Sequence, residues 1–251
     1  MKTIEYLRFR IAMLAVLIII CVAAASPVGA EKIYPTINTD ELKSLFDKKQ
    51  QFVLIDARTK QEFSHAHIVK SINIPDNKLK ENLSLLPADK KTLLIIYCNG
   101  VKCGKSKRLA EQLTPLGYDN IKIYAEGVPV WEERSLPLFV GPDYDKKVEA
   151  KKLKPAELNS MIQEKRTDYV LVDVRDAAEF KGGHIPTAIN IPAESFSARS
   201  GILPKEKKII VYCNTGSRSY LAYKKLIQLA YPNIYQTLLA DWKDMGLAVE
   251  K

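Results

Sequence analysis

The sequence predicts an α/β protein made of two similar domains in tandem, each a parallel β-sheet flanked by helices on both faces. Three observations lead to this prediction. The chain has 251 residues, enough for one large domain or two modest ones. The segment Val53–Pro75 matches Val170–Pro192 without a gap, at a constant offset of 117 residues and with 12 of 23 positions identical. In both halves, short apolar runs alternate with amphipathic segments, which is the pattern of a parallel sheet covered by helices.

Composition and charge narrow the class of protein. Hydrophobic residues make up 47% of the chain and charged residues 27%, which excludes a disordered chain. The counts of 11 Gly, 13 Pro and 4 Cys exclude collagen-like and disulfide-stapled architectures. The net charge is +9, and +7 after residue 30, because residues 1–30 hold three basic residues and one acidic residue. The lysines are scattered without interleaved aromatic residues, so we expect small anionic substrates and no nucleic-acid binding.

Residues 1–30 have the order of a secretory signal peptide. A basic start precedes an uncharged apolar stretch, Ile11–Ala30, which ends in the small residues Val28-Gly29-Ala30 before Glu31. We therefore expect an exported, periplasmic protein that begins near Glu31 and has no membrane contact after cleavage. An uncleaved anchor is the alternative, since about 20 apolar residues can span a bilayer.

Continuous apolar runs predict buried strands, because half-exposed strands would alternate polar and apolar residues. These runs are Val53–Ile55, Leu93–Tyr97, Val170–Val172 and Ile209–Tyr212. Helices are predicted over 156–165, which follows Pro155 at a helix start, and over 219–229. The second helix has an apolar stripe of Leu221, Ala222, Leu226 and Leu229.

The repeat sets the domain boundaries. Each half carries one late tryptophan, Trp131 or Trp242, which we expect in the core. We predict one domain over 31–140 and another over 153–251, joined by a Pro- and Lys-rich linker over 141–152.

Three cysteines remain after the leader: Cys98, Cys103 and Cys213. In an oxidising compartment an odd number leaves at least one thiol unpaired, which makes it a candidate for chemistry. Cys98 and Cys213 each follow a predicted strand, at the carboxyl edge where open α/β sheets bind ligands.

The segment Cys213–Ser219 predicts an anion-binding loop. Gly216 and the start of a helix allow successive backbone N–H groups to face an anion, and Arg218 adds a permanent positive charge. Such surroundings lower a thiol pKa from about 8.5 to roughly 3.5–7.5, so we expect Cys213 to be a thiolate near neutral pH.

The chain after the leader resembles a tandem rhodanese, a pair of sulfurtransferase-type domains. The resemblance rests on three blocks in order: Asp173–Arg175 with Glu179-Phe180, Gly183–Pro186 with Ala188–Pro192, and the Cys213–Ser219 loop. It implies that Cys213 takes a sulfane sulfur from thiosulfate or a persulfide, carries it as a persulfide without a cofactor, and passes it to a thiol or other nucleophile. A protein could be the acceptor. It also implies that the loop binds substrate through Asn214, Thr215, Gly216, Ser217, Arg218 and Ser219.

The first half departs from this pattern. Its loop, Cys98–Ser106, is two residues longer and has Lys105 in place of Arg218, so it lacks the bidentate guanidinium. Cys98 is a second candidate sulfur carrier. Cys103 is a candidate redox partner that could close a disulfide onto Cys98 or resolve a persulfide there. The alternative is a degenerate first domain with a structural role.

Both halves contain an Asp-x-Arg followed four residues after the Arg by Glu. The two sets are Asp56, Arg58 and Glu62, and Asp173, Arg175 and Glu179. We expect each Arg to pair with its Glu at helical spacing and each Asp to cap the turn, rather than to act as acid and base.

The histidines favour structural roles. His67 and His184 precede Ile in the same repeated motif, and attack on a sulfane sulfur needs no base once the thiol is ionised. His65 with His67 forms a lone His-x-His, and no carboxylate or cysteine cluster completes a metal site, so no metal is expected.

Two other functions remain open. Cell-cycle dual-specificity phosphatases resemble the same fold and use Cys and Arg in a longer loop, so a phosphatase or arsenate reductase is one alternative. The short spacing from Cys213 to Arg218 favours sulfur transfer instead. The other alternative is a non-catalytic module that receives persulfide sulfur or docks a partner.

Overall fold

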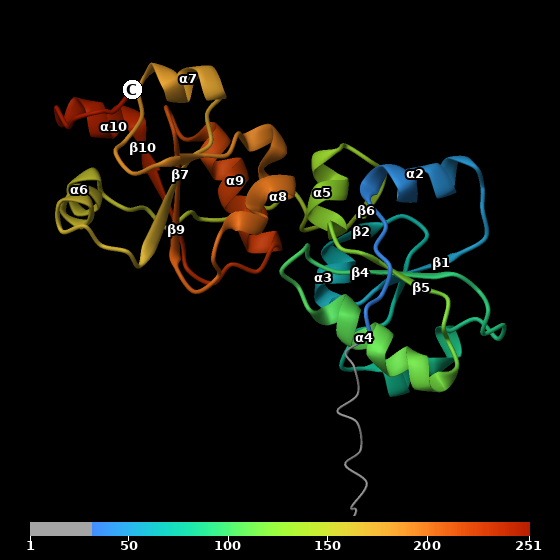
Figure 1. Cartoon of the computed structure of the whole chain (residues 1–251). Helices are drawn as coiled ribbons and strands as arrows, with labels where there is room; N and C mark the ends of the chain where they lie inside the picture. The colour runs from blue at the N-terminus through green and yellow to red at the C-terminus, as the bar shows by residue number, and fades with distance from the viewer. Residues whose placement is uncertain (1–31) are drawn as a thin grey trace, which may run out of the picture. The chain divides into compact units, whose positions relative to one another are not determined.

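The computed structural model describes residues 32–251, of which Tyr34–Lys251 form one compact unit. Two similar α/β copies follow one another within this unit (Figure 1). The predicted signal peptide lies outside the described residues. Within residues 32–251, no helix combines the length and the apolar character needed to cross a membrane.

The first copy contains a sheet of four parallel strands in the order β3-β1-β4-β5. Its strands are β1 (Val53–Asp56), β3 (Ile72–Asn73), β4 (Leu94–Tyr97) and β5 (Ile121–Tyr124). Its helices are α2 (Thr39–Asp47), α3 (Lys60–His65), α4 (Lys105–Leu113) and α5 (Gly127–Glu133), with 3-10 turns η1 (Leu79–Leu85) and η2 (Thr114–Leu116).

The second copy repeats this sheet in the order β8-β7-β9-β10, again with parallel strands. Its strands are β7 (Tyr169–Asp173), β8 (Ile189–Asn190), β9 (Lys208–Cys213) and β10 (Ile234–Leu238). Its helices are α6 (Pro155–Gln163), α7 (Ala177–Gly182), α8 (Phe196–Arg199), α9 (Ser217–Gln228) and α10 (Leu239–Asp244), with 3-10 turns η3 (Ala193–Ser195) and η4 (Ser200–Ile202).

Helices cover both faces of each sheet, as Figure 1 shows. In the second copy, Leu226 of α9 shares a core cluster with Val211 on one face, and Trp242 of α10 shares another with Leu171 on the opposite face. The first copy divides its core in the same way. Because strand side chains point alternately to the two faces, both faces must be apolar, and the predicted strands and fold class are confirmed.

The predicted core tryptophans are also confirmed. Trp131 is 2% exposed and Trp242 is 1% exposed, and each donates its indole N–H to a backbone carbonyl. Truncating either to Ala would cost about 3–5 kcal/mol, because the cavity would not collapse completely.

One predicted helix stripe was wrong in part. Ala222, Leu226 and Leu229 are buried, but Leu221 is 53% exposed and Tyr223 is buried in its place. One residue along an α-helix is a rotation of about 100°, so Leu221 turns away from the face that Ala222 presents to the sheet. The sequence analysis also missed an antiparallel pair, β2 (Ala66–Ile68) with β6 (Leu138–Val140), because both strands are short.

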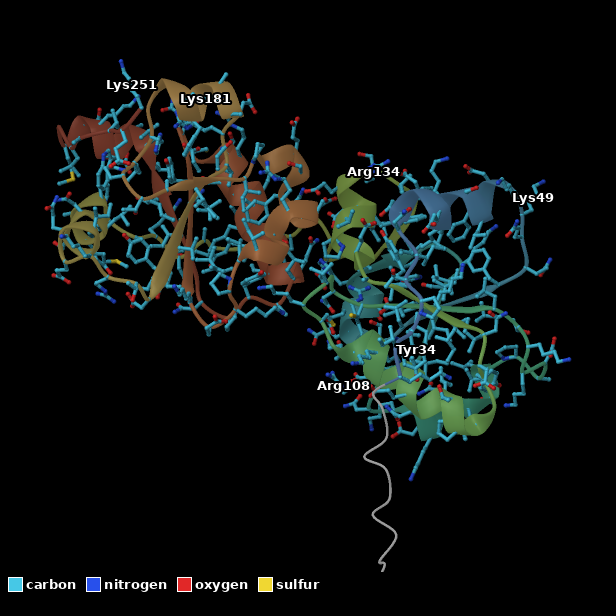
Figure 2. All side chains as sticks on the ribbon, viewed as in Figure 1. Tyr34, Lys49, Arg108, Arg134, Lys181 and Lys251 are labelled. Carbon is cyan, nitrogen blue, oxygen red and sulfur yellow. The ribbon has the colours of Figure 1, made fainter. Side chains whose placement is uncertain are left out.

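Apart from two buried Asp–Arg pairs, the charged residues of 32–251 lie on the outside of the copies, as expected for scattered lysines. Lys49, Lys181 and Lys251 are exposed and extend from the ribbon in Figure 2. The cores between the sheets and helices are therefore apolar, and the buried polar residues of the site lie at the ends of strands.

Candidate active site: two cysteine loops

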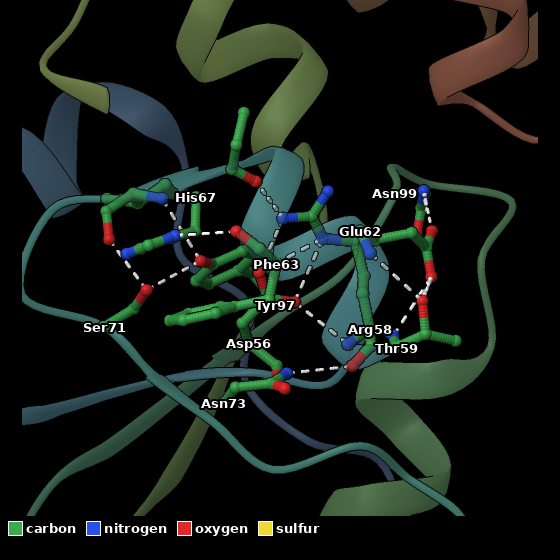
Figure 3. A network of polar contacts seen from close by, with 12 residues as sticks. Asp56, Arg58, Thr59, Glu62, Phe63, His67, Ser71, Asn73, Tyr97 and Asn99 are labelled. Atoms are coloured by element: carbon green, nitrogen blue, oxygen red, sulfur yellow. Dashed lines mark hydrogen bonds and ion pairs between the residues drawn. The ribbon is translucent and has the colours of Figure 1, made fainter. Parts of the chain in front are cut away.

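A buried ion pair lies at the carboxyl end of the first strand in each sheet. In the second copy, Arg175 Nη2 lies 2.5 Å from Asp173 Oδ2 and also donates to the Gly183 carbonyl. In the first copy, Arg58 Nη2 lies 2.6 Å from Asp56 Oδ2 (Figure 3). The side chains of these four residues are at most 7% exposed. A buried pair is stable only when its other polar atoms are also bonded, and the repeated geometry meets that need.

The expected pairing of each Arg with its Glu was therefore wrong. Helical spacing does not apply, because Arg58 lies in the turn before α3, where its guanidinium folds back onto Asp56. The capping role expected of the Asp residues is confirmed: Asp56 Oδ1 and Asp173 Oδ1 each accept the backbone N–H two residues further on at 2.9 Å, and the same carboxylates bind the arginine side chains.

Each freed Glu instead binds the cation in the cysteine loop. Arg218 Nη2 donates to Glu179 Oε1 at 2.9 Å, and Lys105 Nζ donates to Glu62 Oε2 at 2.8 Å. The hydrogen bond from Arg218 is the main cause that lowers the pKa of Glu179 to about 2. Burial raises the pKa of Glu62, but hydrogen bonds led by that from Lys105 outweigh it and lower the value to about 2. Both carboxylates are ionised at neutral pH.

Cys213 is the last residue of β9, and backbone N–H groups surround its sulfur. The N–H groups of Gly216 and Ser219 donate to Sγ at 3.2 and 3.4 Å, and the Ser219 hydroxyl lies 3.5 Å away. Burial opposes ionisation of this thiol, but the Ser219 hydroxyl and the N–H groups of Ser219, Gly216 and Arg218 outweigh it. The pKa of Cys213 is therefore lowered, as the loop sequence predicts.

Gly216 makes this loop possible. Its φ of +109° places it in the left-handed region, immediately before α9, where an L side chain would be strained. The turn directs the N–H groups at the start of α9 toward the sulfur.

The sequence analysis missed a further residue of this site, Gln236 on the neighbouring strand β10. Gln236 is 1% exposed, and its Nε2 donates to Ser219 Oγ at 2.7 Å and to the Gly216 carbonyl at 2.8 Å. Lys152 Nζ donates to Gln236 Oε1, which fixes the orientation of the amide. The Ser219 hydroxyl thus accepts from Gln236, and its own proton has two acceptors within reach, the Gly216 carbonyl at 3.1 Å and the Cys213 sulfur at 3.5 Å. The signal in the sequence that could have identified this residue is an amide side chain within the strand segment Ile234–Leu238.

The other predicted substrate-binding residues lie around the same loop. Asn214, Thr215 and Ser217 are exposed, and Arg218 is half-buried with its guanidinium bound to Glu179. Their role in substrate binding stays a prediction.

The first loop presents a different environment to its cysteine. Cys98 directly follows β4, and its Sγ donates to the Cys103 carbonyl at 3.3 Å, while Ser106 Oγ lies 3.4 Å away. A carbonyl oxygen accepts a proton and cannot stabilise a thiolate. The hydrogen bond with the Cys103 sulfur, followed by burial and the charge of Cys103, raises the pKa of Cys98 well above its usual range. Cys98 is 1% exposed and carries its proton.

Cys103 has the opposite tendency. It is half-buried, and the pKa of its thiol is lowered to about 6. The hydrogen bond from Cys98 is the largest cause; burial opposes it, and the N–H groups of Asn99 and Lys105 and the Lys105 charge add to it. All three described cysteines are free thiols.

Residues of the second copy hydrogen-bond to the first loop. Asn99 Nδ2 donates to the Gln228 carbonyl at 2.6 Å, and Lys102 Nζ donates to the Leu203 carbonyl at 2.6 Å. These contacts hold the segment between the two cysteines of that loop.

His67 and His184 contact backbone carbonyls, as expected for structural roles. His67 Nδ1 is 2.8 Å from the Phe63 carbonyl and its ring stacks on Phe63; His184 repeats both contacts with Phe180. Among residues 32–251, no three His, Cys, Asp or Glu side chains are grouped so that they could hold a metal ion.

These features define a class of protein: tandem α/β domains with a cysteine at the end of a central strand and an anion-binding loop before a helix. The family model for the rhodanese-like domain matches residues 38–134 and 154–244. The chain belongs to the rhodanese-like family and contains two copies of its domain.

Similar proteins include a sulfurtransferase from Allochromatium vinosum, 37% identical over 84 residues that make up 33% of this chain and 78% of that protein. An adenylyltransferase and sulfurtransferase from Candida albicans is 35% identical over 103 residues, which cover 37% of this chain and 23% of that protein. Among solved structures, thiosulfate sulfurtransferase from Pseudomonas aeruginosa matches with 19% identity and a TM-score of 0.38, over 86% of this chain and 43% of that chain.

Proposed function

We propose that the chain is a sulfurtransferase in which Cys213 carries a sulfane sulfur from thiosulfate or a persulfide to a thiol or other nucleophile. The observation that carries this proposal is the set of N–H groups aimed at Cys213 Sγ, at 3.2 Å from Gly216 and 3.4 Å from Ser219. They favour a thiolate, and a persulfide anion on the same sulfur would meet the same positive end of α9. The sulfurtransferase names of two relatives support the reaction class.

The reaction follows from this geometry in two displacements. The Cys213 thiolate attacks the outer sulfur of thiosulfate, the S–S bond breaks, and sulfite leaves with the bonding electron pair. The acceptor thiolate then attacks the outer sulfur of the Cys213 persulfide, and the Cys213 thiolate leaves. Neither step requires a base beside the thiolate, which agrees with the structural contacts of His184.

The decisive experiment is the intact mass of the reduced protein after incubation with thiosulfate. We expect one added sulfur atom on wild type, removed by cyanide, and no such adduct on Cys213→Ser. Turnover of thiosulfate with cyanide should fall by at least about a thousandfold in this variant, as expected for loss of a covalent nucleophile. Full activity of Cys213→Ser would overturn the proposal. Hydrogen exchange of peptides from the second copy serves as the control for its folding.

Hydrolysis of phosphate esters is less well supported. The Arg218 guanidinium, which would bind the phosphate, is held by Glu179 through both of its terminal nitrogens. A role of Cys98 as the first sulfur carrier is also less well supported, because its sulfur faces a carbonyl oxygen.

We also propose domains over 31–140 and 153–251, joined by a linker over 141–152, on the basis of the sequence repeat. We further propose that the chain is exported to the periplasm. The support for export is the order of basic, apolar and small residues in 1–30. N-terminal sequencing of the protein from its native host should find a start near Glu31; a start at Met1 in the membrane fraction would favour the anchor.

A further inference from the structure

The first loop holds two thiols in unequal states. Cys98 is buried, and its Sγ donates to the Cys103 carbonyl at 3.3 Å. Cys103 is more exposed, and the pKa of its thiol is lowered to about 6, chiefly by the hydrogen bond with Cys98 and further by the N–H groups of Asn99 and Lys105. The Ser106 N–H favours ionisation of Cys98, as the Ser219 N–H does for Cys213, but burial and the neighbouring Cys103 outweigh it.

This arrangement makes Cys103 the nucleophile of the first copy. Cysteines that react first with a donor from solvent are partly exposed and lie in electropositive surroundings. Lys105 supplies the positive charge near Cys103. Cys98 lies directly behind it, because a turn from Gly100 to Cys103, closed by a 2.9 Å backbone hydrogen bond, folds the loop back onto the strand end.

We propose that Cys103 and Cys98 form a dithiol that reduces persulfides to sulfide, an activity separate from the transfer by Cys213. Cys103 thiolate attacks the outer sulfur of a persulfide R–S–SH, the donor S–S bond breaks, and R–SH leaves. Cys98 then attacks Cys103 Sγ, and the outer sulfur leaves as sulfide, which takes the Cys98 proton. The sulfane sulfur gains two electrons, and the pair becomes a disulfide.

The overall step is balanced. One persulfide and two thiols give one thiol, one hydrogen sulfide and one disulfide, with no external oxidant. A small dithiol or a protein dithiol then reduces the disulfide by thiol–disulfide exchange. Cys98 Sγ already lies 3.3 Å from the carbonyl oxygen of Cys103, so the two cysteines are in contact before the disulfide forms. The proposal rests on the sulfane-sulfur chemistry proposed above for the substrate class, but on different residues.

The test uses Cys213→Ser protein, so that only the first copy can react. The reduced, desalted protein is mixed anaerobically with glutathione persulfide, and sulfide and the Cys98–Cys103 disulfide are measured by trapping and peptide mapping. We expect stoichiometric sulfide and disulfide within a single turnover. Adding Cys103→Ser should abolish both. Adding Cys98→Ser should stop the reaction with one extra sulfur on Cys103. A Cys98/Cys103 double variant gives the background from the donor itself.

Several outcomes would overturn the proposal: sulfide release above background in the Cys103 variant, a first persulfide on Cys98, or no disulfide after persulfide treatment. If the Cys103 variant does not fold, early alkylation in the Cys213→Ser protein still identifies which cysteine takes the sulfur first. Thiosulfate:cyanide transfer is measured separately on wild type. Its absence would contradict the function proposed for Cys213 and leave the dithiol result standing.

Discussion

The two cysteine loops begin alike and diverge within a few residues. Each follows a central strand, and each cysteine lies about as far from the serine on the following helix: 3.5 Å for Cys213 and Ser219, and 3.4 Å for Cys98 and Ser106. The Cys213 sulfur accepts backbone N–H groups, whereas the Cys98 sulfur donates to a carbonyl. Two additional residues are enough to exchange a donor for an acceptor, and with it the ionisation state of the thiol.

The strand beside the cysteine-bearing strand also differs between the two copies. Gln236 on β10 pairs with Val211, and Ile123 on β5 pairs with Ile96 at the equivalent register. The second copy thus supports its serine with a buried amide, while the first has a hydrocarbon there. A duplicated fold retains its strands and ion pairs when a few loop and strand residues redirect its chemistry.

The largest expected difference is between Cys103 and Cys98 in the pH dependence of their alkylation. Alkylation of Cys103 by iodoacetamide should be half-maximal near pH 6, because its thiolate forms there. Alkylation of Cys98 should still be rising at alkaline pH, since its pKa is raised. Peptide mapping after timed alkylation gives both profiles. In denaturant both cysteines should titrate near about 8.5, which is the control. A common profile in the folded protein would remove the distinction between the two thiols.

Loss of a buried carboxylate should affect both copies equally in stability and unequally in activity. Asp56→Asn and Asp173→Asn each leave a buried guanidinium without its counter-charge, which should destabilise that copy by about 3–5 kcal/mol. Hydrogen exchange of peptides from each copy measures the two effects separately. At temperatures where both copies remain folded, only Asp173→Asn should slow thiosulfate turnover. Equal losses of turnover would mean that both loops contribute.

Replacing Gln236 by the isoleucine of the first copy tests whether Ser219 needs the hydrogen bond from Gln236. Gln236→Ile, which installs the residue of the first copy, leaves the buried Ser219 Oγ without its donor, while the Gly216 carbonyl keeps the Tyr220 N–H at 2.8 Å. An unsatisfied buried group costs about 1–3 kcal/mol, so persulfide formation on Cys213 should slow by roughly tenfold or more. Ile123→Val in the first copy is the matched control and should leave that rate within error. A rate equal to wild type in Gln236→Ile would show that Ser219 needs no support.

The strands, the repeat and the anion-binding loop could be predicted because they depend on local sequence. Continuous apolar runs indicate buried strands, and Gly216 before a helix indicates a turn of N–H groups. The ion pairs could not be predicted from helical spacing, because Arg58 lies before its helix begins. Gln236 comes from another strand, and the carbonyl at Cys98 depends on how the longer loop turns at Gly100. Such contacts depend on backbone direction and tertiary packing.

The smallest expected effect concerns the loop cation. Arg218→Lys should change stability and turnover little, because Lys105 already makes the equivalent ion pair with Glu62 at 2.8 Å.

Arg218→Ala removes the hydrogen bond that lowers the pKa of Glu179 to about 2, so that pKa should return toward its ordinary value. A depressed carboxyl pKa contributes stability above the unfolded value, about 4.3, and loses it as the pH falls toward 2. The pair is more than one-third exposed on the Glu179 side, and screening limits its contribution to about 0–1 kcal/mol. Urea midpoints at pH 7 and pH 2.5 should therefore separate wild type from Arg218→Ala slightly at the higher pH and hardly at all at the lower. A large turnover defect in Arg218→Lys with unchanged stability would instead place the guanidinium on the anionic donor.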